Sequence, residues 1–247
     1  MFTPVTIRHR HCPEGCLPSL PTHFGVICWN VYKQNRKDAR WSAFIRTQFR
    51  KRPIDLILLQ EAHFTPKNPC TLEEFSFDAA ANIVYGDNLY GVMNASRSVA
   101  SESKAFISDA KEFWFTTRKS LLLTRYRVEN GDELLVVNVH AINFREDRAY
   151  AKEKERLYRF LEDYEGALLI AGDFNTWSAK RVRILQEMTR RLSLNELLFP
   201  PNTVKSFLGH PLDRIFYRKL RPIDRSVLDD GGISDHRPLY ARFEIES

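Results

Sequence analysis

Polar and ionisable residues recur where apolar stretches of this sequence end. The stretch LLIAGDFNTWSAKR, residues 168–181, passes from four apolar residues into Asp173 and Asn175, and the apolar run 54–59 leads into Glu61. Catalytic side chains favour such positions, because a rigid scaffold holds them while loops control access. The residues of this kind are Asn30, Glu61, His140, Asp173, Asn175, Asp213, Asp235 and His236.

Three of these residues offer oxygen ligands for a hard cation. Glu61 and Asp235 are carboxylates, and Asn30 adds an amide oxygen. Mg²⁺ and Mn²⁺ suit such sites, which supply one or two carboxylates and leave several waters on the metal. The sequence therefore predicts a Mg²⁺ or Mn²⁺ cofactor held by Glu61, Asp235 and Asn30.

The remaining residues suit chemistry on a phosphoryl group. Asp173 is a candidate base for a water, and Asn175 could orient that water or a phosphate oxygen. His140 and His236 are candidate donors to the phosphoryl group, and Asp213 could fix the tautomer of His236. No Ser or Cys lies beside a His in a context that would activate it as a nucleophile, so direct attack by water is preferred.

Each of these residues alone also has a structural explanation. Asp173 could form a turn, Asn30 could cap a strand end, and a single His140 at a strand end is more often structural. The occurrence of all of them at strand ends in one chain favours a site.

Strands and helices alternate along the whole chain, and this pattern has to position the site residues. Strands are predicted over 24–32 and 54–62, in the stretch that begins at Leu168, on both sides of the Asn130-Gly131 turn, and in the segments LDRIFYRKL and RPLYARFEI, with one or two more over 83–95. Helices are predicted over 38–50 and 145–164, and after Ser178, with Val182, Leu185, Met188 and Leu192 on the apolar face of the last. This order predicts an α/β fold in which two mixed sheets pack face to face with helices outside.

Composition limits the class of protein but leaves the partner open. The chain has 247 residues, 43% of them hydrophobic, and a net charge of +6, so it is neither disordered nor collagen-like. The positive excess suits an anionic partner such as nucleic acid, a phospholipid headgroup or a phosphate ester, and equally suits a soluble surface rich in arginine. The sequence offers no apolar run of membrane-spanning length and leaves the oligomeric state unknown.

The cysteines and the N-terminal segment indicate a cytoplasmic protein. With no secretory signature, Cys12, Cys16, Cys28 and Cys70 are expected to be reduced thiols. The N-terminal group of His9, His11, Cys12, Cys16 and His23 has zinc-ligand residue types without a zinc-site spacing. We therefore expect residues 1–22 to be a poorly defined arm, and the zinc alternative stays open.

Six motifs in order resemble those of the endonuclease/exonuclease/phosphatase superfamily. They are CWNVYKQNR, ILLQEA, VVNVHAINF, IAGDFNTWS, PLDRIFY and SDHRPL, and the resemblance spans about Val26 to Glu244, nearly the whole chain. This superfamily includes deoxyribonuclease I-like nucleases, abasic-site endonucleases, inositol polyphosphate 5-phosphatases and neutral sphingomyelinases, and the sequence looks most similar to its bacterial YafD-type subgroup. The resemblance implies a four-layered α/β sandwich, a single domain over residues 23–247, and a divalent-metal phosphohydrolase.

The resemblance also implies a role for each matching residue. Glu61 and Asp235 would contact the metal, with support from Asn30, and Asp173 would act on the water. Asn175 and His140 would bind phosphate, with Lys119 as a further phosphate contact. His236 would be the acid or transition-state donor, and Asp213 would support His236. Tyr32 stands where the abasic-site enzymes carry an Asp, which weakens that assignment.

These observations favour a metal-dependent phosphodiesterase, most simply a nuclease. The excess of basic over acidic residues and the Arg-rich helix after Trp177 favour a polyanionic substrate. The alternative is a phosphatase or phosphodiesterase for a phospholipid headgroup, an inositol phosphate or another small phosphate ester, although no long amphipathic membrane element is evident. A binding module without catalysis is disfavoured, because no candidate catalytic position is lost.

Overall fold

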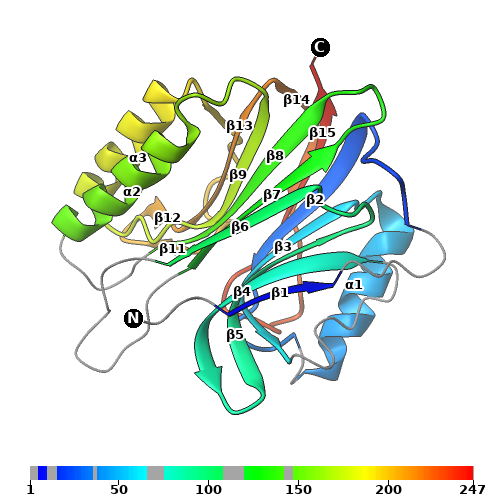
Figure 1. Ribbon diagram of the computed structural model, residues 1–247. Helices are drawn as coiled ribbons and strands as arrows, with labels where there is room; N and C mark the ends of the chain where they lie inside the picture. The colour runs from blue at the N-terminus through cyan, green and yellow to red at the C-terminus, as the bar shows by residue number, and fades with distance from the viewer. Residues whose placement is uncertain are drawn as a thin grey trace.

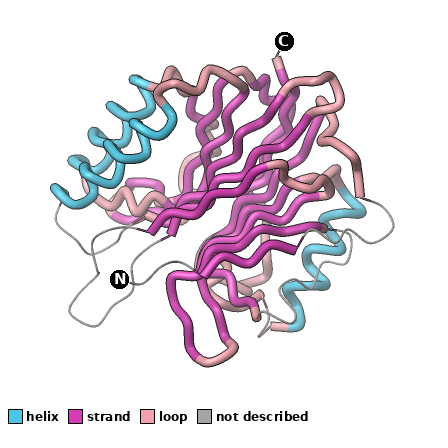
Figure 2. Tube along the Cα trace, viewed as in Figure 1, coloured by secondary structure: helices cyan, strands magenta, loops and turns pink. Residues whose placement is uncertain are grey.

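The molecule is a sandwich of two mixed β-sheets with helices on both outer sides. The computed structural model describes residues 5–9, 16–35, 38–65, 75–107, 120–141 and 147–246. In Figure 1, α2 and α3 lie outside one sheet and α1 lies outside the other, and Figure 2 shows the strands forming the centre. The α/β fold with two packed sheets is therefore confirmed.

One sheet has seven strands in the order β1-β4-β5-β3-β2-β15-β14. Strands β2 and β3 pair in parallel, and the other neighbours are antiparallel. The strands are β1 (Val5–His9), β2 (His23–Asn30), β3 (Leu56–Phe64), β4 (Ser76–Tyr85), β5 (Asn88–Ser96), β14 (Leu220–Val227) and β15 (Leu239–Ile245).

The second sheet has six strands in the order β10-β13-β9-β8-β7-β6, and β11 and β12 form a separate hairpin. Strands β8 and β9 are parallel neighbours. The strands are β6 (Glu102–Ile107), β7 (Ser120–Arg127), β8 (Glu133–His140), β9 (Ala167–Asp173), β10 (Asn195–Glu196), β11 (Ser206–Phe207), β12 (His210–Pro211) and β13 (Asp213–Arg218).

The three helices begin close to their predicted starts. They are α1 (Ala39–Lys51), α2 (Asp147–Leu161) and α3 (Ala179–Arg191). Ser178 caps α3 as expected, because its side chain accepts a hydrogen bond from the backbone N–H of Arg181. The buried face of α3 differs from the expected one: Arg181 is fully buried, whereas Val182 is only partly covered.

Two described parts of the N-terminal segment pack against the rest of the molecule. Val5–His9 forms β1, which pairs with β4 at the edge of the larger sheet, and Leu20 is buried in the core. Cys28 is a free buried thiol, as expected, but Cys16 is disulfide-bonded, so the expectation of a reduced thiol is wrong there. A disulfide also removes Cys16 as a zinc ligand; His11, Cys12 and Cys70 lie outside the described residues.

A chain of buried polar side chains joins the two sheets across their apolar interface. The Asn138 amide on β8 donates to the backbone oxygens of Leu59 and Met93 and to Asn94 Oδ1, and accepts from Gln60 Nε2 at 2.7 Å. Asn94 in turn donates to Thr124 Oγ1 on β7 at 2.9 Å. Because buried amides are costly unless they are hydrogen-bonded, these contacts favour one relative position of the sheets.

Replacing Asn138 should destabilise the fold. Asn138→Ala leaves several buried polar groups without a partner, and we expect it to lower the free energy of unfolding by about 2–4 kcal/mol. Asn195→Ala, at an exposed asparagine on β10, is the matched control and should change it by less than about 0.5 kcal/mol. Urea unfolding of both variants measures the difference, and equal effects would contradict a role for Asn138 in joining the sheets.

Candidate active site

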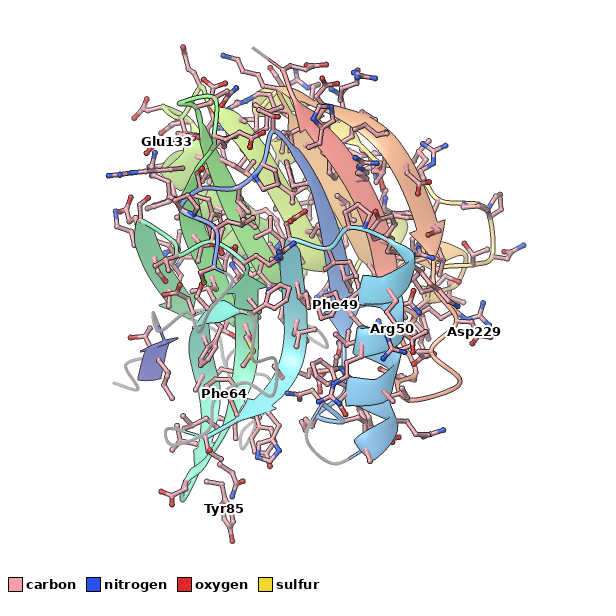
Figure 3. All side chains as sticks on the ribbon, turned by 90° about the vertical axis from the view of Figure 1, so that its right-hand side faces the viewer. Phe49, Arg50, Phe64, Tyr85, Glu133 and Asp229 are labelled. Atoms are coloured by element: carbon pink, nitrogen blue, oxygen red, sulfur yellow. The ribbon has the colours of Figure 1, made fainter. Side chains whose placement is uncertain are left out.

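The candidate site lies at one end of the packed interface between the two sheets. Side chains alternate along a strand. Asn30, His140 and Asp173 end, and Asp213 begins, strand faces whose other members fill the core between the sheets. His140, Asp173 and Asp213 are neighbours in register on β8, β9 and β13. The site is therefore at the end of β8 opposite Glu133, which begins that strand and lies at the far end of the molecule in Figure 3.

Asp173 is the centre of the contacts between the sheets. Its Oδ2 accepts a hydrogen bond from Asn30 Nδ2 at 3.2 Å and lies 3.8 Å from His140 Nε2. The same His140 nitrogen is 3.6 Å from Glu61 Oε1. Asn30 and Glu61 come from the seven-stranded sheet, whereas His140 and Asp173 come from the other, so these residues meet only when the sheets are packed together.

A β-bulge turns Glu61 toward the site. The pairing of β3 with β5 shifts register between Leu59 and Ala62, and Glu61 has a φ of 50°. Both Leu59 and Ala62 face the α1 side of the sheet, which is possible only with an extra residue between them. The bulge thus brings the Glu61 carboxylate to the same side as Asn30, where it also pairs with Lys33 Nζ at 3.3 Å.

His236 and Asp213 form a buried pair. His236 Nδ1 lies 2.7 Å from Asp213 Oδ2. Burial alone would lower the pKa of His236, but the charge and hydrogen bond of Asp213 outweigh it, and with Asp173 and Asp235 nearby the pKa rises to about 9. Trp29 Nε1 donates to the His236 backbone oxygen at 2.8 Å, which fixes the loop that carries the ring.

Asn175 is held in a tight loop after β9. Its backbone φ is 49°, its N–H donates to Asp173 Oδ1, and its side-chain amide donates to the backbone oxygen of Ala141 at 2.9 Å. Between the two polar residues, Phe174 is buried against the helix side of the sheet, with its ring edge on Phe216. Asp173 and Asn175 therefore lie on the site side of the strand, as the sequence predicts.

Arg181 supports this loop and was not predicted from the sequence. The guanidinium is fully buried, lies 4.6 Å from the ring of Tyr150 and 4.5 Å from that of Trp177, and donates from Nη1 to the backbone oxygen of Asn175 at 3.1 Å. Its position in the first turn of a basic helix gave no signal of burial. Its hydrogen bond to the Asn175 backbone oxygen holds the loop in position.

One described residue that the sequence predicts for the site lies outside this cluster. The Asp235 carboxylate is half exposed and accepts a hydrogen bond from Lys205 Nζ at 3.2 Å, at the rim of the site. Lys119 lies outside the described residues. Lys33 and Lys205, which the sequence analysis did not single out, are therefore the cations that face the two carboxylates predicted to bind the metal.

The donor set fits a hard divalent cation. Glu61, Asp173 and Asp235 supply carboxylate oxygens, which Mg²⁺ and Mn²⁺ prefer. Asn30 Oδ1 accepts a hydrogen bond from the backbone N–H of Tyr32 at 3.1 Å, and Nδ2 of the same side chain donates to Asp173 Oδ2. In this arrangement Asn30 therefore supports Asp173. Among the described residues, Asp173, Asp213 and His236 also form a compact group with ligand atoms within 4.8 Å of one another, but the hydrogen bond to Asp213 occupies His236 Nδ1.

Comparison with known proteins gives one consistent result. The endonuclease/exonuclease/phosphatase family model matches residues 27–236. A UPF0294 protein of Vibrio cholerae El Tor is 34% identical over 238 residues, covering 94% of this chain and 82% of that protein. Among solved structures, zebrafish (D. rerio) TDP2 with a single-strand DNA product has a TM-score of 0.63 at 15% identity over 90% of this chain and 99% of that one. The Bacteroides thetaiotaomicron mannosyl-6-phosphatase Bt3783 has a TM-score of 0.63 at 15% identity, covering 89% and 99%.

His236 should titrate unusually high in the metal-free protein. NMR should give it a pKa near 9, and Asp213→Asn should lower that pKa by about 1–3 pH units because the charge is removed. The pKa of His236 in the folded protein lies above its ordinary value of 6.5. The stability that the His236–Asp213 pair contributes is therefore complete below pH 6.5 and is lost as the pH rises through about 9.

Asp235→Asn is the control for this titration, because Asp235 is the weakest of the contributing charges. It should move the pKa of His236 less than Asp213→Asn does. An unshifted pKa in Asp213→Asn would mean that the pair does not form in solution.

Proposed function

The chain belongs to the endonuclease/exonuclease/phosphatase family, and from this we propose that it is a divalent-metal-dependent phosphodiesterase that uses water as the nucleophile. The observation that carries the proposal is the meeting of Glu61, His140 and Asp173 across the two sheets, beside the buried His236–Asp213 pair. Carboxylates, imidazoles and an amide around one small space are the groups that phosphoryl transfer to water requires.

Glu61 and Asp235 are proposed to hold Mg²⁺ or Mn²⁺, with Asn30 as support. The ion would neutralise charge on the phosphate when bound. Glu61 is held at the bulge in β3 and Asp235 lies next to His236 in the chain, so one carboxylate comes from a strand and the other from the loop before β15. In the present arrangement Lys33 and Lys205 supply the positive charge beside them.

Asp173 is proposed to orient the attacking water and accept its proton. Its Oδ2 lies close to Asn30 Nδ2 and His140 Nε2, which fixes the direction of the carboxylate. His236 is proposed to donate to the phosphoryl group or to the leaving oxygen, since its raised pKa keeps the ring cationic at neutral pH. Asp213 acts through His236. Asn175, His140 and Lys119 are proposed to bind the phosphate.

The substrate proposed first is nucleic acid, the simplest polymer of phosphodiesters for a basic protein. The structure weakens one argument for it, because Arg190 and Arg191 on α3 pair with Glu187 and Glu155, and Arg181 is buried. The second candidate is the ester of a phospholipid headgroup, an inositol phosphate or another small phosphate ester.

A cytoplasmic location also stays a prediction. Among the described residues, no helix combines the length and apolarity needed to cross a membrane. Disulfides such as the one at Cys16 are typical of oxidising compartments, which counts against the cytoplasm.

The proposed function is tested by a substrate screen with added Mg²⁺ or Mn²⁺. The screen covers DNA, RNA, phospholipids, phosphoinositides and a soluble chromogenic phosphodiester. We expect hydrolysis of at least one diester, and we expect excess chelator to abolish it. Hydrolysis that persists in chelator would remove the metal from the proposal.

Glu61 and Asp173 should differ in their effect on metal affinity. Glu61→Gln should weaken Mn²⁺ binding by at least about 10-fold because a direct ligand is lost, and Asp173→Asn should weaken it less. Glu133→Gln, at the opposite end of β8, is the control (Figure 3). Calorimetric titration of the three variants measures the affinities, and equal losses for Glu61→Gln and Asp173→Asn would mean that the roles are misassigned.

His236 and Asp213 should behave as one unit in catalysis. His236→Ala should lower kcat by about 10²–10⁴-fold, and Asp213→Asn should lower it less. The double variant should be little worse than His236→Ala, because Asp213 has no further role once its partner is gone. Steady-state kinetics of all three variants decides the point, and multiplied losses would refute the unit.

A further inference from the structure

Helix α2 buries a lysine where its pattern leads us to expect an apolar residue. The buried face of α2 consists of Tyr150, Lys154, Leu157 and Leu161, and this spacing is that of an apolar stripe packed against a sheet. The Lys154 side chain is only 1% exposed. Lysines are almost never fully buried unless they are paired, so a charge at this position needs an explanation.

An ion pair accounts for the charge of Lys154 but not for its burial. Lys154 Nζ lies 2.9 Å from Glu153 Oε1. Glu153 is the preceding residue, and consecutive side chains on a helix point in different directions. A lysine on the exposed face of α2 could pair with a glutamate just as well, so the ion pair gives no reason for Nζ to lie beneath the helix.

The buried end of Lys154 lies close to two aromatic rings, one of which belongs to the loop after β9. Nζ is 4.9 Å from the centre of the Tyr150 ring and 5.4 Å from that of the Phe174 ring. A cation within about 6 Å of a ring centre is attracted to the ring, most strongly away from water. Phe174 is fully buried and stands between Asp173 and Asn175, so Lys154 contacts the residue that joins these two.

The Tyr150 ring connects Lys154 on α2 with Arg181 on α3. Arg181 Cζ is 4.6 Å from the ring centre, and Arg181 Nη1 donates to the backbone oxygen of Asn175. Helices α2 and α3 lie side by side outside the six-stranded sheet (Figure 1). The loop after β9 is therefore held from both helices, because Lys154 contacts Phe174, Arg181 contacts Asn175, and both cations contact one ring.

The ring of Tyr150, rather than its hydroxyl, serves these contacts. The hydroxyl oxygen is buried and finds no hydrogen-bond partner among the described residues. Burial raises the pKa of Tyr150, so the hydroxyl stays protonated at neutral pH and offers no negative charge to Lys154 or Arg181. The attraction of the two cations to Tyr150 thus depends on the face of the aromatic ring.

We propose that Lys154 and Tyr150 are positioning residues for the reaction, because they fix Phe174 and thereby the directions of Asp173 and Asn175. The inference rests on the proposed function for the roles of Asp173 and Asn175. Apolar contacts alone have no strong directional preference, whereas a cation favours the face of a ring. A displacement of about 1 Å can slow a reaction by about 100-fold, so a small loosening of this loop would suffice to lower the rate.

The first test compares Lys154→Met with Lys152→Met, which changes an exposed lysine on the same helix. Methionine keeps an unbranched stem and removes the charge, and Glu153 is partly exposed and can be hydrated in its place. We expect Lys154→Met to lower kcat by about 10-fold or more and to change KM less. The midpoint of urea unfolding should stay the same or rise, because a buried charge is removed. Lys152→Met should change none of these quantities.

A second pair of variants tests the ring. Tyr150→Leu removes the aromatic face and should lower kcat as Lys154→Met does. Tyr150→Phe keeps the face, removes only the unpartnered hydroxyl, and should retain most of the kcat that Tyr150→Leu loses. A kcat that is the same in the two variants would overturn the role of the ring.

Hydrogen exchange measured by NMR tests the inference without a substrate. The Phe174 N–H donates to Leu212 O, and the Asn175 N–H donates to Asp173 Oδ1. In Lys154→Met both amides should exchange at least about 10-fold faster, whereas the amides of β8 should exchange as in the unchanged protein.

Three outcomes would overturn the inference: unchanged exchange at Phe174 and Asn175, equal acceleration in β8, or an unchanged kcat with a lowered urea midpoint. Each would mean that Lys154 serves the stability of the fold alone or does not hold the loop. No hydrolysis of any diester by the unchanged protein would refute the proposed function instead, and the exchange rates would still decide whether Lys154 positions Phe174 and Asn175.

Discussion

The arrangement of the candidate site depends on how the Asn138 amide is satisfied. This side chain lies between two sheets that are held together mostly by apolar contacts, which have no strong directional preference. Its partners on β3 and β5 are satisfied only at one relative position of the sheets. Asn138 is two residues from His140, and Gln60 is next to Glu61. The contacts that align the sheets therefore also align His140 and Glu61, which face each other at the site end of the sheet interface.

Because each sheet supplies part of the site, the site is a property of the packed sandwich. Asn30 and Glu61 on one side have their partners, Asp173 and His140, on the other. The loops add the remaining groups: Ser234 Oγ donates to the backbone oxygen of Asn30 and accepts from the His236 N–H, which ties the His236 loop to the end of β2. A rigid scaffold with short tied loops can hold several groups around one phosphate without reorganisation during the reaction.

The sequence predicted the parts of the site that follow from strand periodicity. Asn30, His140, Asp173 and Asp213 end or begin apolar strands, and alternation alone places them on the inner face. It did not predict the inward turn of Glu61, because a bulge depends on pairing with β5 rather than on local residue types. Nor did it predict the burial of Arg181, since only the packing of α2 and α3 against Trp177 and Tyr150 encloses that side chain. The edge strand β1 was missed because it has only five residues, and β14 was missed because a proline and several charged residues interrupt its pattern.

Left-handed backbone is concentrated around the site: Tyr32, Lys33, Glu61 and Asn175 all have positive φ. Non-glycine residues adopt this conformation at a cost, of order 1 kcal/mol each, so the rest of the sandwich has to compensate for it. Selection for thermostability alone would replace Tyr32, Lys33 and Glu61 with glycine or asparagine and would erode the site. Thermostable relatives of this chain would thus have to gain their extra stability elsewhere, in the core or on the surface, and this end of the molecule is where consensus-based stabilisation is most hazardous to activity.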